Sequence, residues 1–311
     1  MICMVLFAFG IMDCKVNKKI LHFVQNDKMC IFARMNKLNR TQLLPDRPGI
    51  PPMAKMPEPE TLDVPALAEA YRLGEIDLIC VLGPTASGKT RYAVNLAQRM
   101  QGASDPRALP AEILSADSRQ VYRGMDIGTG KDLREYGEVP YHLIDLVPAG
   151  SKYNIYQYQK DFAAAYADVR SRGTVPILCG GSGLYIEAVT RAYKFEKENG
   201  LSAAALPQKV YYIGTLVSRE ERVARIDRRL EERLQEGLIE EVKGLLETVP
   251  APNLIYYGLE YKFVTLYILG ELSYEDMVVA LGNAIHQFAK RQMTWFRGME
   301  RDGITIHWVR P

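Results

Sequence analysis

Short apolar runs alternate with amphipathic stretches along most of the chain beyond residue 75. The apolar runs predict buried strands at residues 77–82, 112–115, 176–179 and 210–213. Between them, apolar residues recur every three or four positions, which predicts helices over 90–100 and 184–191 and from residues 218 and 273 onward. This alternation predicts an α/β fold in which helices flank a parallel sheet.

Polar residues and glycine mark the expected ends of two of these helices. Ser218 is followed three positions later by Glu221, which predicts a capping box at a helix start. Gly237 interrupts the same helical pattern and predicts its end. Ser273 with Asp276 predicts the start of the last long helix, which runs toward residue 296.

Residues 1–60 differ from the rest of the chain. They show no clear periodicity, carry nine Lys and Arg against five acidic residues, and end in a proline-rich stretch. We expect a disordered extension, or one translated from an upstream start with Met53 or Met56 as the functional beginning; a basic interaction arm is the alternative. The folded core is then expected at 75–311. Because the whole chain has a formal net charge of only +2, nucleic-acid contacts in that core must rest on local patches.

The apolar runs and the cysteines bear on the cellular compartment of the protein. The longest apolar run, residues 4–12, is far too short to span a membrane, and it lacks the flanks of a typical signal peptide. The five cysteines show no paired metal-ligand spacing. Cys80 and Cys179 lie in predicted strands, where a reduced core thiol is the expected state. These features favour a soluble protein of the reducing cytoplasm.

One motif carries specific chemistry. The stretch after the strand at 77–82 fits G-x-x-x-x-G-K-[ST] and consists of Gly83, Pro84, Thr85, Ala86, Ser87, Gly88, Lys89 and Thr90. Its glycines let successive N–H groups point toward a phosphate, the ammonium of Lys89 adds a positive charge, and the Thr90 hydroxyl is placed to bind Mg²⁺ at a helix N-terminus. The motif predicts a phosphate loop of the nucleotide- and ATP-binding type; an ordinary glycine-rich turn is the alternative.

Two further strand ends are expected beside this loop, because ligands of open parallel sheets bind beyond the carboxyl ends of the strands. Asp117 follows the strand at 112–115, and its carboxylate can act as a general base or help to hold a Mg²⁺ ion. The alternative is that Asp117 is the N-cap of a helix. The turn 180–183 follows the strand at 176–179, and its Ser182 hydroxyl can reach a substrate; a plain strand-to-helix turn is the alternative.

Two helices carry many basic residues. The arginines of the helix after Ser218 are Arg219, Arg222, Arg225, Arg228, Arg229 and Arg233. Most of them are expected on a solvated face with ion pairs at i,i+4 spacing, whereas one or two can reach a diphosphate. The last helix interleaves basic and aromatic residues between His286 and Arg297, which suits a phosphate backbone and a stacked base, although Trp295 fits a core position equally well.

Taken together, five blocks of the chain resemble one known family. They are GPTASGKT at 83–90, ILSADSRQVYRGMDIGTGK at 113–131, VPYHLID at 139–145, PILCGGSGLYIEA at 176–188 and KRQMTWFR at 290–297. In this order they are similar to the tRNA dimethylallyltransferases, also called tRNA isopentenyltransferases of the IPP transferase family. A phosphate loop alone names only a superfamily, whereas the second block beside it narrows the choice to this group. The resemblance implies a P-loop NTPase-like parallel sheet flanked by helices.

The resemblance also implies a reaction and a set of roles. A dimethylallyl group would pass from dimethylallyl diphosphate to N6 of the adenosine on the 3′ side of the anticodon, position 37 of tRNA, with Mg²⁺ and without ATP hydrolysis. The loop 83–90 with Lys89 would bind the diphosphate, Thr90 would hold Mg²⁺, Arg225 would neutralise the leaving group, and Asp117 would accept the proton from the amine. The flipped-out adenine of the anticodon stem-loop would contact Asp117, Ser118, Arg119, Gln120 and Ser182. We expect a cytoplasmic monomer.

Two departures from the family's pattern stand out. Family members carry several dozen further residues, a helical insertion implicated in gripping the anticodon stem-loop, where this chain has only 191–209. We therefore expect a reduced insertion region and weaker tRNA binding. In the segment 258–262, Glu260 precedes Tyr261, whereas the family usually has the acid after the tyrosine. An adenylate prenyltransferase, a P-loop kinase of a small molecule and a catalytically impaired, shortened paralogue remain alternative interpretations.

Overall fold

A parallel sheet forms the centre of the protein. The structure, a computed structural model, describes residues 57–102, 108–191 and 203–311. Six strands lie in the order β4-β2-β6-β1-β7-β8, and every neighbouring pair is parallel. They are β1 (Leu78–Leu82), β2 (Ala111–Ser115), β4 (Tyr141–His142), β6 (Val175–Gly180), β7 (Val210–Thr215) and β8 (Ile306–Val309). The predicted α/β fold is confirmed, and a small parallel pair, β3 (Tyr122–Arg123) with β5 (Val147–Pro148), lies outside this sheet.

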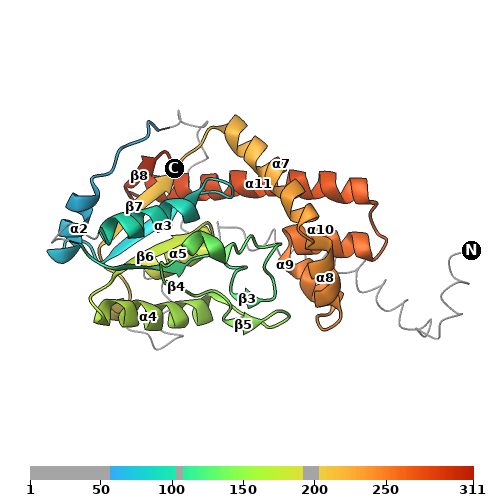
Figure 1. Cartoon of the computed structure of the whole chain (residues 1–311), viewed down its shortest axis with the longest axis horizontal. Helices are drawn as coiled ribbons and strands as arrows, with labels where there is room; N and C mark the ends of the chain where they lie inside the picture. The colour runs from blue at the N-terminus through green and yellow to red at the C-terminus, as the bar shows by residue number, and fades with distance from the viewer. Residues whose placement is uncertain (1–56, 103–107, 192–202) are drawn as a thin grey trace, which may run out of the picture. The chain divides into compact units, whose positions relative to one another are not determined.

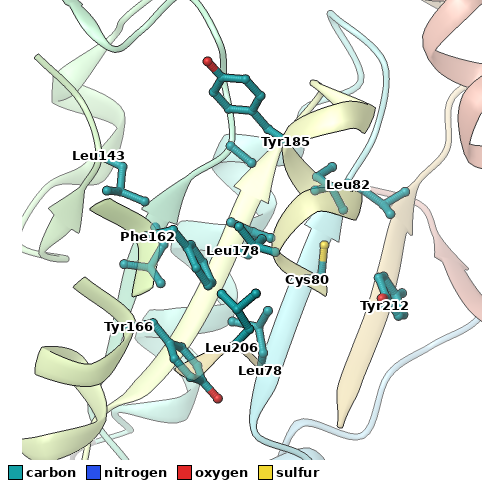
Figure 2. Close-up of a cluster of buried hydrophobic side chains, with 14 of the residues drawn as sticks. Leu78, Cys80, Leu82, Leu143, Phe162, Tyr166, Leu178, Tyr185, Leu206 and Tyr212 are labelled. Atoms are coloured by element: carbon teal, nitrogen blue, oxygen red, sulfur yellow. The ribbon is translucent and has the colours of Figure 1, made fainter. Parts of the chain in front are cut away.

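The two faces of the sheet pack into two separate cores. Side chains of β1 alternate between them: Leu78, Cys80 and Leu82 enter one cluster, whereas Ile79 and Val81 enter the other. Figure 2 shows the first cluster around Cys80 and Leu178. Strands buried on both faces read as continuous apolar runs, which explains why the sequence predicted them well. The first face is covered by α4 (Ile155–Ser171) and α5 (Gly183–Thr190), and the second by α2 (Val64–Arg72) and α3 (Lys89–Met100).

A helical group follows the last central strand, β7. Its members are α7 (Arg219–Gln235), α8 (Leu238–Leu246), α9 (Ala251–Tyr257), α10 (Leu259–Ile268) and α11 (Tyr274–Arg301). The 28-residue helix α11 crosses from this group to the sheet, as Figure 1 shows. Along its length Met277 packs with α8–α10, Ile285 packs with α7, and Phe296 enters the core on the sheet. One helix therefore connects the helical group to the carboxyl-end edge of the sheet.

The predicted helix ends are mostly confirmed. Ser218 caps α7 by accepting the Glu221 N–H at 3.0 Å, but the Glu221 carboxylate accepts from Arg225 instead of returning to Ser218, so the predicted capping box is only half formed. Gly237, with φ of 103°, follows the end of α7 as expected. Ser273 caps α11 by accepting the Asp276 N–H at 3.0 Å, and the helix continues beyond residue 296 to Arg301.

The described residues begin at Pro57, so residues 1–56 of the predicted extension 1–60 lie outside them, with the candidate starts Met53 and Met56 and with Cys3, Cys14 and Cys30. The folded core begins before the expected residue 75, because the Glu60 N–H donates to the Trp308 carbonyl at 2.7 Å and α2 packs on α3.

Cys80 and Cys179 are both free and buried, as predicted. Among the described residues, no helix has the length and apolar character needed to cross a bilayer.

Deleting residues 1–52 is expected to leave activity unchanged and to shift the melting temperature by no more than about 2 °C. The reason is that this stretch offers no periodic apolar face to bury against the core. Differential scanning calorimetry of the full chain and the shortened chain measures the shift. A fall of several degrees would show that the extension is part of the fold.

Candidate active site

The predicted phosphate loop connects β1 to α3. Its backbone takes the left-handed conformation at Ala86, with φ of 59°, and at Gly88, with φ of 79°. The Ser87 hydroxyl is fully buried and lies 2.7 Å from the Thr215 hydroxyl of β7. A Cβ at Gly83 would lie 2.1 Å from that Thr215 oxygen, so only glycine fits there. Packing within the protein therefore holds the loop in its curled shape.

Lys89 is the first residue of α3, and its ammonium interacts electrostatically with Cys179 of β6 and with Asp117, which follows β2. Burial lowers the pKa of its ammonium, the charge of Asp117 opposes this, and the charge of Arg229 adds to it. Within the described part of the chain, Lys89 forms no ion pair. A partly desolvated cation without a counter-ion favours an anionic ligand. By contrast, burial raises the pKa of the neighbouring Cys179 thiol to about 12, against the charge of Lys89 and a hydrogen bond from Thr90, so this thiol stays protonated and is no nucleophile.

Asp117 lies two residues beyond the end of β2. Its Oδ1 accepts the Arg119 N–H at 2.9 Å, which closes a turn. No helix starts after this turn, so the N-cap alternative does not hold. The second carboxylate oxygen accepts no hydrogen bond from the described residues and is left to accept a proton.

The turn 180–183 after β6 contacts the Asp117 turn directly. Ser182 Oγ accepts the Ser118 N–H at 3.0 Å, and the Ser182 N–H donates to the Ala116 carbonyl at 3.3 Å. A Cβ at Gly180 would lie 2.3 Å from that carbonyl oxygen, so the close approach requires glycine. Although Ser182 is the N-cap residue of α5, its hydroxyl makes no capping bond. The structure thus brings Asp117, Ser118 and Ser182 together, as the sequence predicted.

Two of the residues predicted to contact adenine have partners within the protein. The Arg119 guanidinium lies over the Tyr257 ring of α9, 5.6 Å from its centroid. The Gln120 side-chain oxygen accepts from the Ser115 hydroxyl at 3.4 Å. Both side chains support the turn that carries Asp117, and their contact with adenine stays a prediction.

Arg225 of α7 reaches the phosphate loop, as its predicted role requires. Its Nη1 donates to the Ala86 carbonyl at 3.5 Å, and its Nη2 donates to Glu221 at 2.6 Å. Ala86 in turn packs against the cluster formed between α7 and α11. The loop is therefore seated on the helix that supplies the arginine.

Arg229, one turn further along the same helix face, is a residue whose role the sequence did not single out. Its Nη2 donates to the Gly130 carbonyl at 3.3 Å, and it forms no ion pair among the described residues. Desolvation, followed by the charge of Arg233, lowers its pKa to about 10. Arg233 itself is neutralised by a buried pair with Glu260 at 2.7 Å. Arg229 is thus a second cation near Lys89 that lacks a carboxylate, and its i+4 spacing from Arg225 is the sequence pattern that points to it.

The segment 126–131 is hydrogen-bonded to the helical group and to the loops beside it. Glu241 of α8 accepts the N–H groups of residues 126–128 at 2.7 to 3.0 Å and the Tyr261 hydroxyl at 2.7 Å. The Lys131 ammonium donates to the Tyr122 carbonyl and to the carboxylates of Asp126 and Asp145. These contacts fasten the chain beyond Asp117 to α8 and α10.

The last predicted site block, at 290–297, has a buried side and an exposed side. Trp295 packs against the core on the sheet, and a Cβ at Gly183 would lie 2.4 Å from its ring, so the core alternative holds for this residue. Arg297 pairs with Glu300 at 2.7 Å. Lys290 and Arg291 are exposed and stay available to a phosphate backbone. Gln292 is buried between two loops of the site, a position that no sequence pattern predicted.

Comparisons with known proteins agree with this geometry. The model of the family described as IPP transferase matches residues 120–209 and 193–299. The chain is 46% identical over 290 residues to a tRNA dimethylallyltransferase 2 of Porphyromonas gingivalis, covering 75% of this chain and 93% of that relative. It is also 46% identical over 291 residues to a tRNA dimethylallyltransferase 1 of Parabacteroides distasonis, covering 75% and 92% of the two chains.

A solved structure shares the fold. The crystal structure of a full-length tRNA isopentenylpyrophosphate transferase from Bacillus halodurans superposes with a TM-score of 0.63 at 28% identity, covering 75% of this chain and 89% of that one. The family match extends over more than half of the chain, and the relatives are matched over most of their length. With a phosphate loop, an acid and a serine turn at three adjacent strand ends, the chain belongs to the IPP transferase family.

Proposed function

We propose that this enzyme transfers a dimethylallyl group from dimethylallyl diphosphate to N6 of the adenosine at position 37 of tRNA, on the 3′ side of the anticodon. The observation that carries the proposal is the meeting of β1, β6 and β2, neighbours in the sheet, whose carboxyl ends place the phosphate loop, Ser182 and Asp117 at one edge. A donor site for a diphosphate and an acceptor site with a base are thereby adjacent, as a group transfer requires.

The donor site is cationic. Free amides of the phosphate loop, together with Lys89, Arg225 and Arg229, bind the diphosphate of the donor. The amides of Thr85 and Ser87 are already used, since they donate to Gln292 and to the Pro84 carbonyl. As the bond between C1 of the dimethylallyl group and the diphosphate oxygen breaks, negative charge grows on the leaving group, and these cations stabilise it. No nucleotide is hydrolysed, because the diphosphate of the donor is itself the leaving group.

The acceptor site is built around Asp117. The adenine leaves the stack of the anticodon loop to reach this edge of the sheet, with Ser118 and Ser182 beside it. N6 attacks C1, the new N–C bond forms, and the free oxygen of Asp117 accepts the proton released from the amine. Ser182 positions the turn by accepting the Ser118 N–H.

Mg²⁺ fits the residues that are present. In the described ranges, no group of three or more acidic, His or Cys side chains is placed to hold a metal ion, so a site made of protein ligands alone is absent there. Mg²⁺ instead prefers one or two protein oxygens combined with substrate phosphates and water. Thr90, in the first turn of α3, would supply one such oxygen. The ion, when bound, would neutralise charge on the diphosphate.

Prenyl transfer from labelled dimethylallyl diphosphate to tRNA and to AMP, an assay of ATP consumption and a titration with inorganic diphosphate together test the proposal. We expect label to enter unmodified tRNA and not AMP. Transfer to AMP alone would establish an adenylate prenyltransferase, and consumption of ATP with phosphate transfer would establish a kinase. Binding of diphosphate without transfer to either acceptor would establish a shortened, inactive paralogue.

We further propose that the protein acts as a monomer in a reducing compartment such as the cytoplasm. The two free buried thiols support the reducing compartment.

The short connection between α5 and β7 supports a reduced insertion region. The match to the P. gingivalis relative spans 290 residues but only 75% of this 311-residue chain, so the relative has aligned positions with no counterpart here. The two family-model matches also overlap within 193–209. Residues 192–202 lie outside the described residues.

We expect weaker tRNA affinity and a shallower salt dependence than in the P. gingivalis relative. Each tRNA phosphate that the shorter region leaves without a basic partner makes the negative slope of log affinity against log salt less steep by about 0.7 to 0.9. Fluorescence anisotropy of labelled tRNA across a salt series measures both quantities for the two proteins. Equal slopes and equal affinities would show that other surfaces, such as the exposed Lys290 and Arg291, bind the tRNA instead.

A further inference from the structure

The Gln292 side chain joins the two substrate-binding loops of the site. The Thr85 N–H of the phosphate loop donates to its Oε1 at 2.8 Å, and its Nε2 donates to the Gly181 carbonyl at 2.9 Å. The residue is only 7% exposed. One buried amide thus bridges the donor loop after β1 and the acceptor turn after β6.

The chemistry of this bridge requires an amide. One end must accept from an N–H group and the other must donate to a carbonyl oxygen, which no carboxylate or hydrocarbon side chain of this length can do at neutral pH. The bridge is closely packed, because a Cβ at Gly181 would lie 2.4 Å from Gln292 Nε2 and 3.2 Å from the Gly83 carbonyl oxygen. The two loops leave the sheet as neighbours, since Leu82 pairs with Gly180, and the Gln292 side chain adds a hydrogen-bonded link between them beyond the strand ends.

The bridge continues to the proposed base. Gly181 is followed by Ser182, which accepts the Ser118 N–H, and Ser118 is the neighbour of Asp117. At its other end, Gln292 lies on α11, which is packed against α7 at Ile285 and into the sheet core at Phe296. Helix α11, packed at both places, thus carries a side chain that is bonded to both loops.

We propose that Gln292 is a positioning residue that sets the distance between C1 of the bound dimethylallyl diphosphate and N6 of the adenine. This inference rests on the proposed function. Gln292 acts through Thr85 and Gly181, and no contact of its own with the reacting atoms is required. Bond formation needs the reacting atoms to lie about 3 to 3.5 Å apart, and a displacement of about 1 Å costs about 100-fold in rate. Loss of the bridge therefore affects the chemical step more than the binding of either substrate.

Gln292→Met tests this, since methionine has a similar length but neither accepts nor donates a strong hydrogen bond. We expect kcat to fall about 100-fold, while KM for both substrates and Kd for inorganic diphosphate change by less than about threefold. Gln98→Met, at an exposed position of helix α3 away from both loops, is the matched control and should behave as wild type. Steady-state and single-turnover transfer to tRNA, diphosphate titration and melting temperature are measured for all three proteins.

Gln292→Glu separates the two halves of the bridge. The carboxylate still accepts the Thr85 N–H but no longer donates to Gly181, so we expect a folded protein that retains diphosphate binding and has lost most of its kcat. The inference is overturned if either variant keeps wild-type kcat, or if kcat falls only in proportion to the fraction of protein that remains folded and binds diphosphate. If wild type itself transfers no dimethylallyl group, the proposed function fails and this inference with it.

Discussion

Asp117→Asn is expected to lower the rate of dimethylallyl transfer by about 10²- to 10⁴-fold, the range that a positioned general base contributes. The amide oxygen can still accept the Arg119 N–H, so the turn persists, but the side chain no longer accepts a proton from N6. Binding of inorganic diphosphate should stay near the wild-type value, because Asp117 is not a ligand of the phosphate loop. Single-turnover assays and diphosphate titration measure the two quantities separately.

A matched control comes from Asp63, an exposed acid that caps α2 by accepting the Ala66 N–H at 3.1 Å. Asp63→Asn preserves that cap and should leave both transfer and stability unchanged. If Asp117→Asn turns over at a rate close to wild type, Asp117 serves only to close its turn, and another group must accept the proton.

Lys89→Met should weaken diphosphate binding and slow transfer by about 100-fold or more, because it removes a charge that stabilises the leaving group in a partly desolvated site. The same change is not expected to lower the melting temperature. Burial lowers the pKa of Lys89, which means that the fold disfavours its charged form, so a neutral side chain of similar length relieves that cost. Activity and stability should therefore change independently.

Lys160→Met, at an exposed position of α4, controls for the loss of one positive charge and should bind diphosphate as wild type does. Unaltered diphosphate affinity in Lys89→Met would remove the phosphate-loop hypothesis. A large fall in melting temperature would show that the Lys89 side chain stabilises the fold through interactions that its charge does not explain.

The four central strands of the sheet and the main part of the site were predictable because each has a strong local pattern, whereas the edge strands β4 and β8 were not predicted. The central strands are buried on both faces and appear as continuous apolar runs, and the spacing of Gly83, Gly88 and Lys89 has few other uses than phosphate binding. Asp117 and Ser182 followed from topology, since adjacent parallel strands end at the same edge of the sheet.

The helical group and two of the site residues depend on tertiary packing. Helices α8 and α9 have nine and seven residues, too short to be stable alone, and their boundaries follow from packing against α10 and α11. In the sequence, Arg229 resembles five other arginines of one helix, and only the packing of α7 shows which of them lack acidic partners. Gln292 bonds backbone atoms 207 and 111 residues away, which no local pattern reveals.

The central claim is that this chain places a dimethylallyl group on N6 of one adenosine of tRNA. Its most direct test is to incubate the full chain with Mg²⁺, dimethylallyl diphosphate and an unmodified anticodon stem-loop RNA, and to identify the modified nucleoside by mass spectrometry after digestion. We expect one dimethylallyl group on N6 of the adenosine that follows the anticodon, and none on a matched RNA with guanosine at that position. Transfer to a different nucleoside, equal labelling of both RNAs, or labelling of neither would contradict the account.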